Sequence, residues 1–182
     1  MKRILVCVLI LSLAFLATGC AEPKEAPSPS PSVKPSEEPS PTIPPRELVF
    51  DENGNVILDE KGQIDGLAAM DGIDAFTTEE ILKIAPYSDG ALTTSVFFTL
   101  GRRLLKDFDE TLSEIAAAEI SEERGGVEQL GYGLGYEIGL DLQSEVVTEE
   151  DCKILYAEHD LTAPEQAVLD KIIEGFENAR NS

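Results

Sequence analysis

Residues 130–142, which read LGYGLGYEIGLDL, decide the fold class because they fit both a strand and a helix. With a two-residue period, leucine, tyrosine and isoleucine share one face, while glycine, Glu137 and Asp141 share the other, as in a half-buried strand. With a 3.6-residue period, three glycines lie on the side of a helix opposite the two acidic residues. These glycines are Gly131, Gly135 and Gly139. Such a glycine face would let the backbone of a second helix approach closely.

We predict that this segment is a helix. Glycine costs a helix about 1 kcal/mol per residue and also weakens a strand interior, so propensity leaves both alternatives open. Length favours the helix, because strands usually have about 3–10 residues and the sequence offers no comparable partner strand. A long helical partner is predicted just upstream, where Ala116–Ala118 provide small side chains for the contact.

Residues 91–120 are predicted to form that long helix. Apolar residues recur there at intervals of three and four, and charged residues lie mostly off the apolar stripe. The stripe consists of Leu92, Val96, Phe97, Leu100, Leu104, Phe108, Leu112 and Ile115. Gly125–Gly126 is expected to separate this helix from the glycine-rich segment.

Three further helices are predicted from capping boxes, in which a threonine is followed three residues later by an acidic residue. The three pairs are Thr77 with Glu80, Thr148 with Asp151, and Thr162 with Glu165. The helices they start are expected to reach Ala85, Tyr156 and the C-terminal region, where Val168, Leu169, Ile172, Ile173 and Phe176 form an apolar stripe.

An eight-residue repeat precedes the helices. Asp51-Glu52-Asn53-Gly54 is followed by Asp59-Glu60-Lys61-Gly62, and Asn-Gly is a strong hairpin signal. We therefore predict two turns that join three short strands: Leu48–Phe50, Val56–Leu58 and Gln63–Ile64. The expected fold class is a mainly α, small helical domain with a short N-terminal β-hairpin or meander.

The same repeat has the spacing of a calcium loop at Asp51, Asn53 and Asn55. An EF-hand loop needs glycine at its sixth position and a bidentate glutamate at its twelfth. Val56 and Gly62 occupy these positions, so we do not predict a calcium site here.

Residues 20–46 are predicted to be a disordered linker. Nine of the 11 prolines and five serines fall within residues 21–46, with almost no apolar residues. A segment of this composition cannot bury enough surface to offset its ordering entropy. Residues 47–182 form the folded candidate, one domain by length, with ten aromatic residues available for its core.

The first 19 residues are predicted to be a secretory signal. Met1-Lys2-Arg3 is basic, Ile4–Ala17 is apolar except for Ser12, and small residues follow. A transmembrane helix needs about 20 apolar residues, and this run is shorter.

The end of the leader, Leu16-Ala17-Thr18-Gly19-Cys20, resembles the lipobox of bacterial lipoproteins. That resemblance implies that signal peptidase II cuts before a lipidated Cys20 and that the chain is held at the extracytoplasmic face of the cell membrane. It covers only the leader and implies no activity for the rest of the chain.

The folded candidate carries 31 acidic and 9 basic side chains, a formal charge of −22. Such a surface repels nucleic acid, whose binding depends on lysine and arginine. We expect the membrane to be contacted through the lipid on Cys20, the protein partner to be a basic envelope protein, and divalent cations to bind only weakly.

The sequence contains no recognisable catalytic or metal-binding motif, and we predict no cofactor. His159 is the single histidine, and it is expected to be a solvated loop residue; Cys152 is expected to be a small buried side chain. The favoured function is a non-catalytic binding or accessory module. The alternative is a carboxylate-dependent hydrolase of the cell envelope, which would need one carboxyl group of raised pKa in a cleft.

Overall fold

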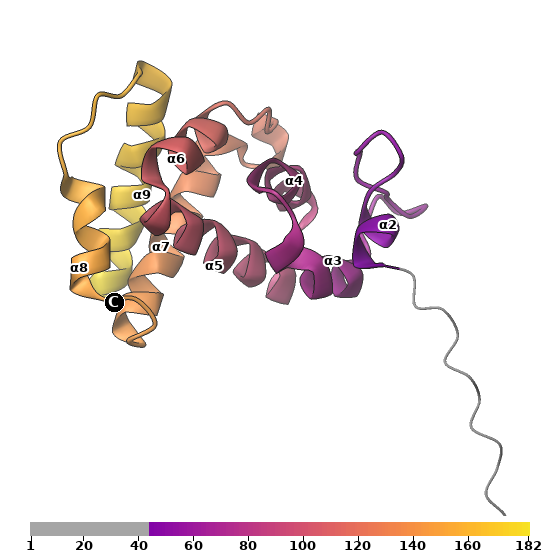
Figure 1. Cartoon of the computed structure of the whole chain (residues 1–182), viewed down its shortest axis with the longest axis horizontal. Coiled ribbons are helices and arrows are strands. Elements are labelled where there is room, and N and C mark those ends of the chain that lie inside the picture. Colours follow the sequence, from indigo (N-terminus) through magenta and orange to yellow (C-terminus); the bar gives the residue numbers. More distant parts are fainter. Residues whose placement is uncertain (1–43) are drawn as a thin grey trace, which may run out of the picture. The chain divides into compact units, whose positions relative to one another are not determined.

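The computed structural model describes residues 44–182, which are mainly helical, as predicted (Figure 1). The leader, Cys20 and nearly all of the predicted linker lie outside the described residues. The helices are α2 (Pro45–Val49), α3 (Gly66–Gly72), α4 (Thr78–Ile84), α5 (Gly90–Lys106), α6 (Phe108–Ala116), α7 (Gly126–Gln143), α8 (Glu149–Cys152) and α9 (Ala163–Arg180). No helix within residues 44–182 is long and apolar enough to cross a membrane.

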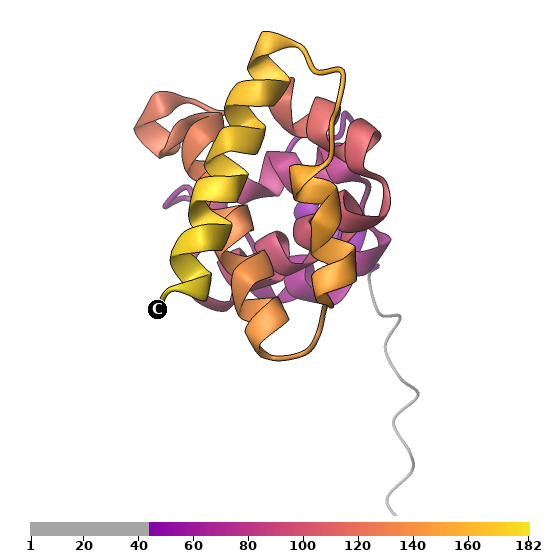
Figure 2. The ribbon, with the colours of Figure 1, turned by 90° about the vertical axis from the view of Figure 1, so that its left-hand side faces the viewer.

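Helices α7 and α9 lie side by side and share the most extensive contact among the described elements (Figure 2). Helix α5 packs against α7, and α6 packs against both α5 and α9. The core lies between these helices and α4. Its largest fully buried side chains are Phe176, Ile81, Ile84, Leu100, Leu104, Leu112, Ile115, Leu134, Ile138, Leu155, Ile172 and Val49.

The helix prediction for residues 130–142 is confirmed, because they lie within α7. The three capping boxes are also present, at the starts of α4, α8 and α9. Helix α8 continues into a 3-10 turn, Lys153–Tyr156, so the predicted segment that ends at Tyr156 has two helical geometries. Helix α3 was not predicted from the sequence. Its N-cap is Asp65, whose side chain accepts a hydrogen bond from the Ala68 N–H.

The single long helix predicted for residues 91–120 is wrong. It is interrupted at Asp107, whose backbone (φ −128°, ψ 65°) is not helical, and its second part ends at Ala116. The Asp107 N–H donates to the Arg103 carbonyl and closes α5, while the Asp107 carbonyl accepts the first hydrogen bond of α6 from Thr111. The apolar stripe continues unbroken through Leu104 and Phe108, so periodicity does not reveal this break.

The eight-residue repeat forms two turns with the same hydrogen bonds. The N–H of Gly54 donates to the Asp51 carbonyl, and that of Gly62 donates in the same way to Asp59. Both glycines have positive φ, 75° and 74°, which glycine adopts without steric cost.

Residues 44–64 contain one isolated antiparallel bridge, between Phe50 and Val56. They contain no strand of more than this single bridged pair. The strand predicted at Leu48–Phe50 is wrong for its first two residues, because they lie in α2. Helix α2 begins at Pro45, one residue before the predicted linker ends, because proline suits the first turn of a helix.

Candidate functional site

A groove of about 620 Å³ lies between the first repeat turn, α4 and the end of α6. We call it the α4–α6 groove. Its apolar lining includes Val56, Leu82, Ala117, Ala118 and Ile120. Its charged lining consists of Glu79, Lys83, Glu114 and Glu119. A concave surface with apolar walls and a few polar groups is the usual form of a ligand site.

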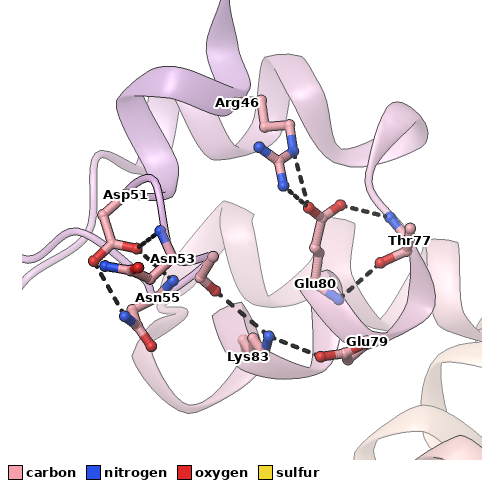
Figure 3. Close-up of polar contacts among 9 residues, drawn as sticks. Arg46, Asp51, Asn53, Asn55, Thr77, Glu79, Glu80 and Lys83 are labelled. Carbon is pink, nitrogen blue, oxygen red and sulfur yellow. Dashed lines mark hydrogen bonds and ion pairs between the residues drawn. The ribbon is translucent and has the colours of Figure 1, made fainter.

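The first repeat turn forms one wall of the groove and is fixed by Asp51 (Figure 3). The Asp51 carboxylate accepts hydrogen bonds from the backbone N–H groups of Asn53 (2.9 Å) and Asn55 (2.8 Å), and from the Asn55 side-chain amide (3.1 Å). These bonds, chiefly those from Asn55, lower the pKa of Asp51. The turn therefore presents Asn55 and Val56 to the groove in a fixed position.

Helix α4 forms the second wall, and Glu80 fixes its start (Figure 3). One oxygen of Glu80 accepts the Thr77 N–H at 3.0 Å, and the other accepts from Arg46 Nε at 2.9 Å and Nη2 at 2.7 Å. The Glu80 side chain is only 14% exposed. Burial raises its pKa, but the bonds from Thr77 and Arg46 outweigh burial, so the net shift is downward.

Lys83 connects the two walls. Its Nζ atom lies 2.8 Å from a carboxylate oxygen of Glu79 and 3.4 Å from the Gly54 carbonyl oxygen. Figure 3 shows the side chain of this α4 lysine joined to the turn on one side and to Glu79 on the other. Lys83 is therefore already paired, and its charge is balanced by Glu79.

The third wall is the end of α6 and the residues that follow it. Glu114 lies in α6, and Ala117–Ile120 come after the helix has ended. Within residues 44–182, neither Glu114 nor Glu119 forms an ion pair. The charge of the groove lining is consequently negative.

A second hollow, of about 740 Å³, is lined by residues of α5 together with Val146, Val147 and Asp151. Among its basic residues, Arg103 donates to the Phe76 carbonyl at 2.6 Å, and Lys106 lies 3.5 Å from Asp107. The Thr99 hydroxyl is buried without a hydrogen-bond partner among the described residues. Basic and acidic side chains both line this hollow, so its charge favours no class of ligand.

Two carboxyl groups on α7 have raised pKa values. Burial raises the pKa of Asp141, against the opposing effect of Arg102. Burial also raises the pKa of Glu137, and the neighbouring Asp141 adds to that shift. Neither residue lines either of the two hollows.

We expect Asp141→Asn to stabilise the protein at pH 7. A carboxyl group whose pKa is raised on folding favours the folded state only when it is protonated, so this contribution is lost as pH rises from the unfolded pKa through the folded one. Asparagine carries no charge at either pH, so the variant does not lose this stability as pH rises. Thermal melts at pH 7 and pH 4 would measure the effect, which should be larger at pH 7. An equal change in melting temperature at both pH values would contradict the prediction.

The predicted helix-packing residues lie on α7 and face α9. A methyl group added at Gly135 would lie 1.8 Å from the Ile172 carbonyl oxygen, and one at Gly139 would lie 3.0 Å from that of Phe176. At Gly131 the corresponding distance, to the Val168 carbonyl oxygen, is 3.2 Å.

The partner predicted for these glycines, the helix with Ala116–Ala118, is wrong, because the backbone that they approach belongs to α9. Gly175 on α9 was not predicted as a packing residue. A methyl group there would lie 2.0 Å from the Tyr132 carbonyl oxygen, so the close approach is reciprocal. The spacing of Gly175 and Ala179 on one side of α9 was the available signal.

The prediction of a solvated His159 is wrong. Its side chain is only 9% exposed and stacks on Phe108 with ring centroids 4.0 Å apart. Its Nε2 atom lies 2.8 Å from the Ile154 carbonyl oxygen. His159 therefore holds the loop before α9 against α6.

Cys152 is buried, as predicted. Burial raises the pKa of its thiol to about 11, so little thiolate is present at neutral pH. Among the described residues, no group of three or more histidine, cysteine or acidic side chains is placed to hold a metal ion. Comparisons with known protein families, with curated proteins and with solved structures find no match.

Proposed function

We propose that this protein is a non-catalytic binding or accessory module, tethered by lipid on Cys20 to the extracytoplasmic face of the cell membrane. The α4–α6 groove is its binding site. The groove is the observation that carries the proposal, because three separate segments form a hollow whose lining combines apolar side chains with Glu114 and Glu119, which form no ion pair within residues 44–182. The anchor rests on the resemblance of residues 16–20 to a lipobox.

Binding accounts for the groove better than hydrolysis does. A carboxylate-dependent hydrolase would use an acid of raised pKa in contact with its substrate. Glu137 and Asp141 have raised pKa values, but neither lines either hollow. The lining of the groove instead combines carboxylates with apolar side chains, as expected for recognition of a partner.

We expect a partner to be captured in cells by a short aliphatic diazirine analogue, which is too small to fill the groove, placed at Ala117 in the full-length chain. Ala117 is exposed and lines the groove, so a bound partner would lie within reach of the reactive group. The matched control carries the analogue at Ala157, which is exposed and lines neither hollow.

The measurement is the appearance of a light-dependent adduct of higher mass on a denaturing gel. We expect a defined adduct from position 117 and none from position 157. Equal yields from the two positions, or no adduct from position 117, would contradict a binding role for the groove.

A further inference from the structure

We infer that the occupant of the α4–α6 groove is a peptide segment of a partner protein with one large apolar side chain flanked by lysine or arginine. This inference rests on the proposed function, because it names the chemistry of the partner for the same site. It follows from three properties of the groove: its apolar lining, its unpaired charge and the fixed position of its walls.

The apolar lining accounts for the large side chain. Leu82 is buried, while Val56, Ala118 and Ile120 are half-buried and Ala117 is exposed at the groove. The small alanine side chains leave space between the larger ones, and the volume of about 620 Å³ falls in the range of ligand sites. Burial of an apolar side chain here would remove apolar surface from water on both partners.

The unpaired carboxylates account for the basic flanks. Lys83 is balanced by Glu79 and held by the Gly54 carbonyl, so it is not available to attract an anion. Glu114 and Glu119 have no cationic partner within residues 44–182. The folded part, with its charge of −22, adds a long-range attraction for cations and repels an acidic segment.

The fixed walls reduce the cost of binding. Asp51 holds the turn, and the Arg46–Glu80 pair and the Thr77 capping box hold the start of α4. Lys83 then joins the turn to α4. A site that is already ordered loses less conformational entropy when it binds. A bare metal cation would satisfy the carboxylates but leave the apolar lining exposed, so a peptide segment fits the groove better.

The test uses purified full-length protein in non-ionic detergent and three fluorescent peptides of the same length. The first has a central leucine flanked by lysines, the second has glutamates in place of the lysines, and the third has alanine in place of the leucine. Fluorescence anisotropy gives the Kd of each peptide at low and high salt. We expect the first peptide to bind most tightly and its affinity to fall as salt rises.

Variants of the protein locate the binding. Glu114→Gln with Glu119→Gln should weaken binding of the first peptide by about fivefold at low salt, since two exposed ion pairs of about 0.2–1 kcal/mol each correspond to about twofold to 30-fold. Ala117→Phe should abolish its binding by filling the groove. The matched controls are Glu128→Gln with Glu158→Gln, which removes the same charge outside both hollows, and Ala157→Phe. At physiological ionic strength both should change the Kd by less than about twofold, because charges outside the groove are screened beyond about 8 Å and Ala157 does not line it.

Equal weakening by the groove and control variants would show that only net charge attracts the peptide and would overturn the inference. Equal affinity for the lysine and glutamate peptides would overturn it as well. If position 117 still captures a partner in cells, such a result rejects the proposed chemistry while the binding role stands. If position 117 captures nothing and no peptide binds, the proposed function itself fails.

Discussion

Gly135→Ala should destabilise the folded protein by more than about 3 kcal/mol. The added methyl group would lie 1.8 Å from the backbone carbonyl oxygen of Ile172, a distance that no rotation of a side chain can relieve. Overpacking of a core costs about 1–3 kcal/mol when side chains can adjust, and here α7 and α9 would have to move apart. Since domains of this size are stable by about 5–15 kcal/mol, this loss is a large part of the total free energy of unfolding. Urea unfolding followed by circular dichroism would measure the change.

Two other glycines provide a graded control for this prediction. A methyl group at Gly66 meets no atom within 4 Å, and alanine favours helices over glycine by about 1 kcal/mol, so Gly66→Ala should be neutral or stabilising. Gly131→Ala should lie between the two, because its methyl group would be 3.2 Å from the Val168 carbonyl oxygen. If Gly135→Ala unfolds at the same urea concentration as Gly66→Ala, the close contact between α7 and α9 is wrong.

Cys20→Ala, made together with a leader that is cleaved without prior lipidation, should move the protein from the membrane fraction to the soluble fraction almost completely. Stable retention requires two or more acyl chains, since a single chain binds membranes only marginally. Without the cysteine no lipid can be attached at this position, and no helix within residues 44–182 could span a membrane in its place. Fractionation and mass spectrometry of the full-length chain would show the loss of both membrane retention and lipid mass.

Cys152→Ala is the matched control, because it removes a thiol that is buried in the core. It should leave the protein in the membrane fraction with its lipid. A Cys20→Ala variant that stays in the membrane with unchanged mass would contradict the lipid anchor.

The sequence was sufficient to predict the helices whose signals are local. Capping boxes at Thr77, Thr148 and Thr162 mark real helix starts because each depends on residues three positions apart. The helical state of residues 130–142 followed from length and glycine spacing. The partner of that helix could not be inferred in the same way, since Ala116–Ala118 and Gly175 offer small residues to it equally well.

The break at Asp107 shows where periodicity loses information. The apolar stripe stays in phase across the break, but the charges do not: α5 ends with Arg103 and Lys106, and α6 begins with Asp109 and Glu110. Basic residues favour helix ends and acidic residues favour helix starts. This change of sign was the sequence signal for two helices.

The α4–α6 groove could not be predicted because its walls come from three separate parts of the chain. Val56, Lys83 and Glu119 come together only when the turn, α4 and the end of α6 have packed. No spacing in the sequence relates these positions. The contact of Lys83 with the Gly54 carbonyl is likewise a product of the fold.

The reciprocal contact of Gly135 and Gly175 has a consequence for hydrogen exchange. Each glycine lies against a carbonyl group of the other helix, so neither α7 nor α9 can open locally without losing the surface of its neighbour. Their amide protons should therefore exchange with one common opening free energy, as members of a single cooperative unit. The two turns between Asp51 and Gln63, which are held mainly by their own hydrogen bonds, should exchange independently and much faster.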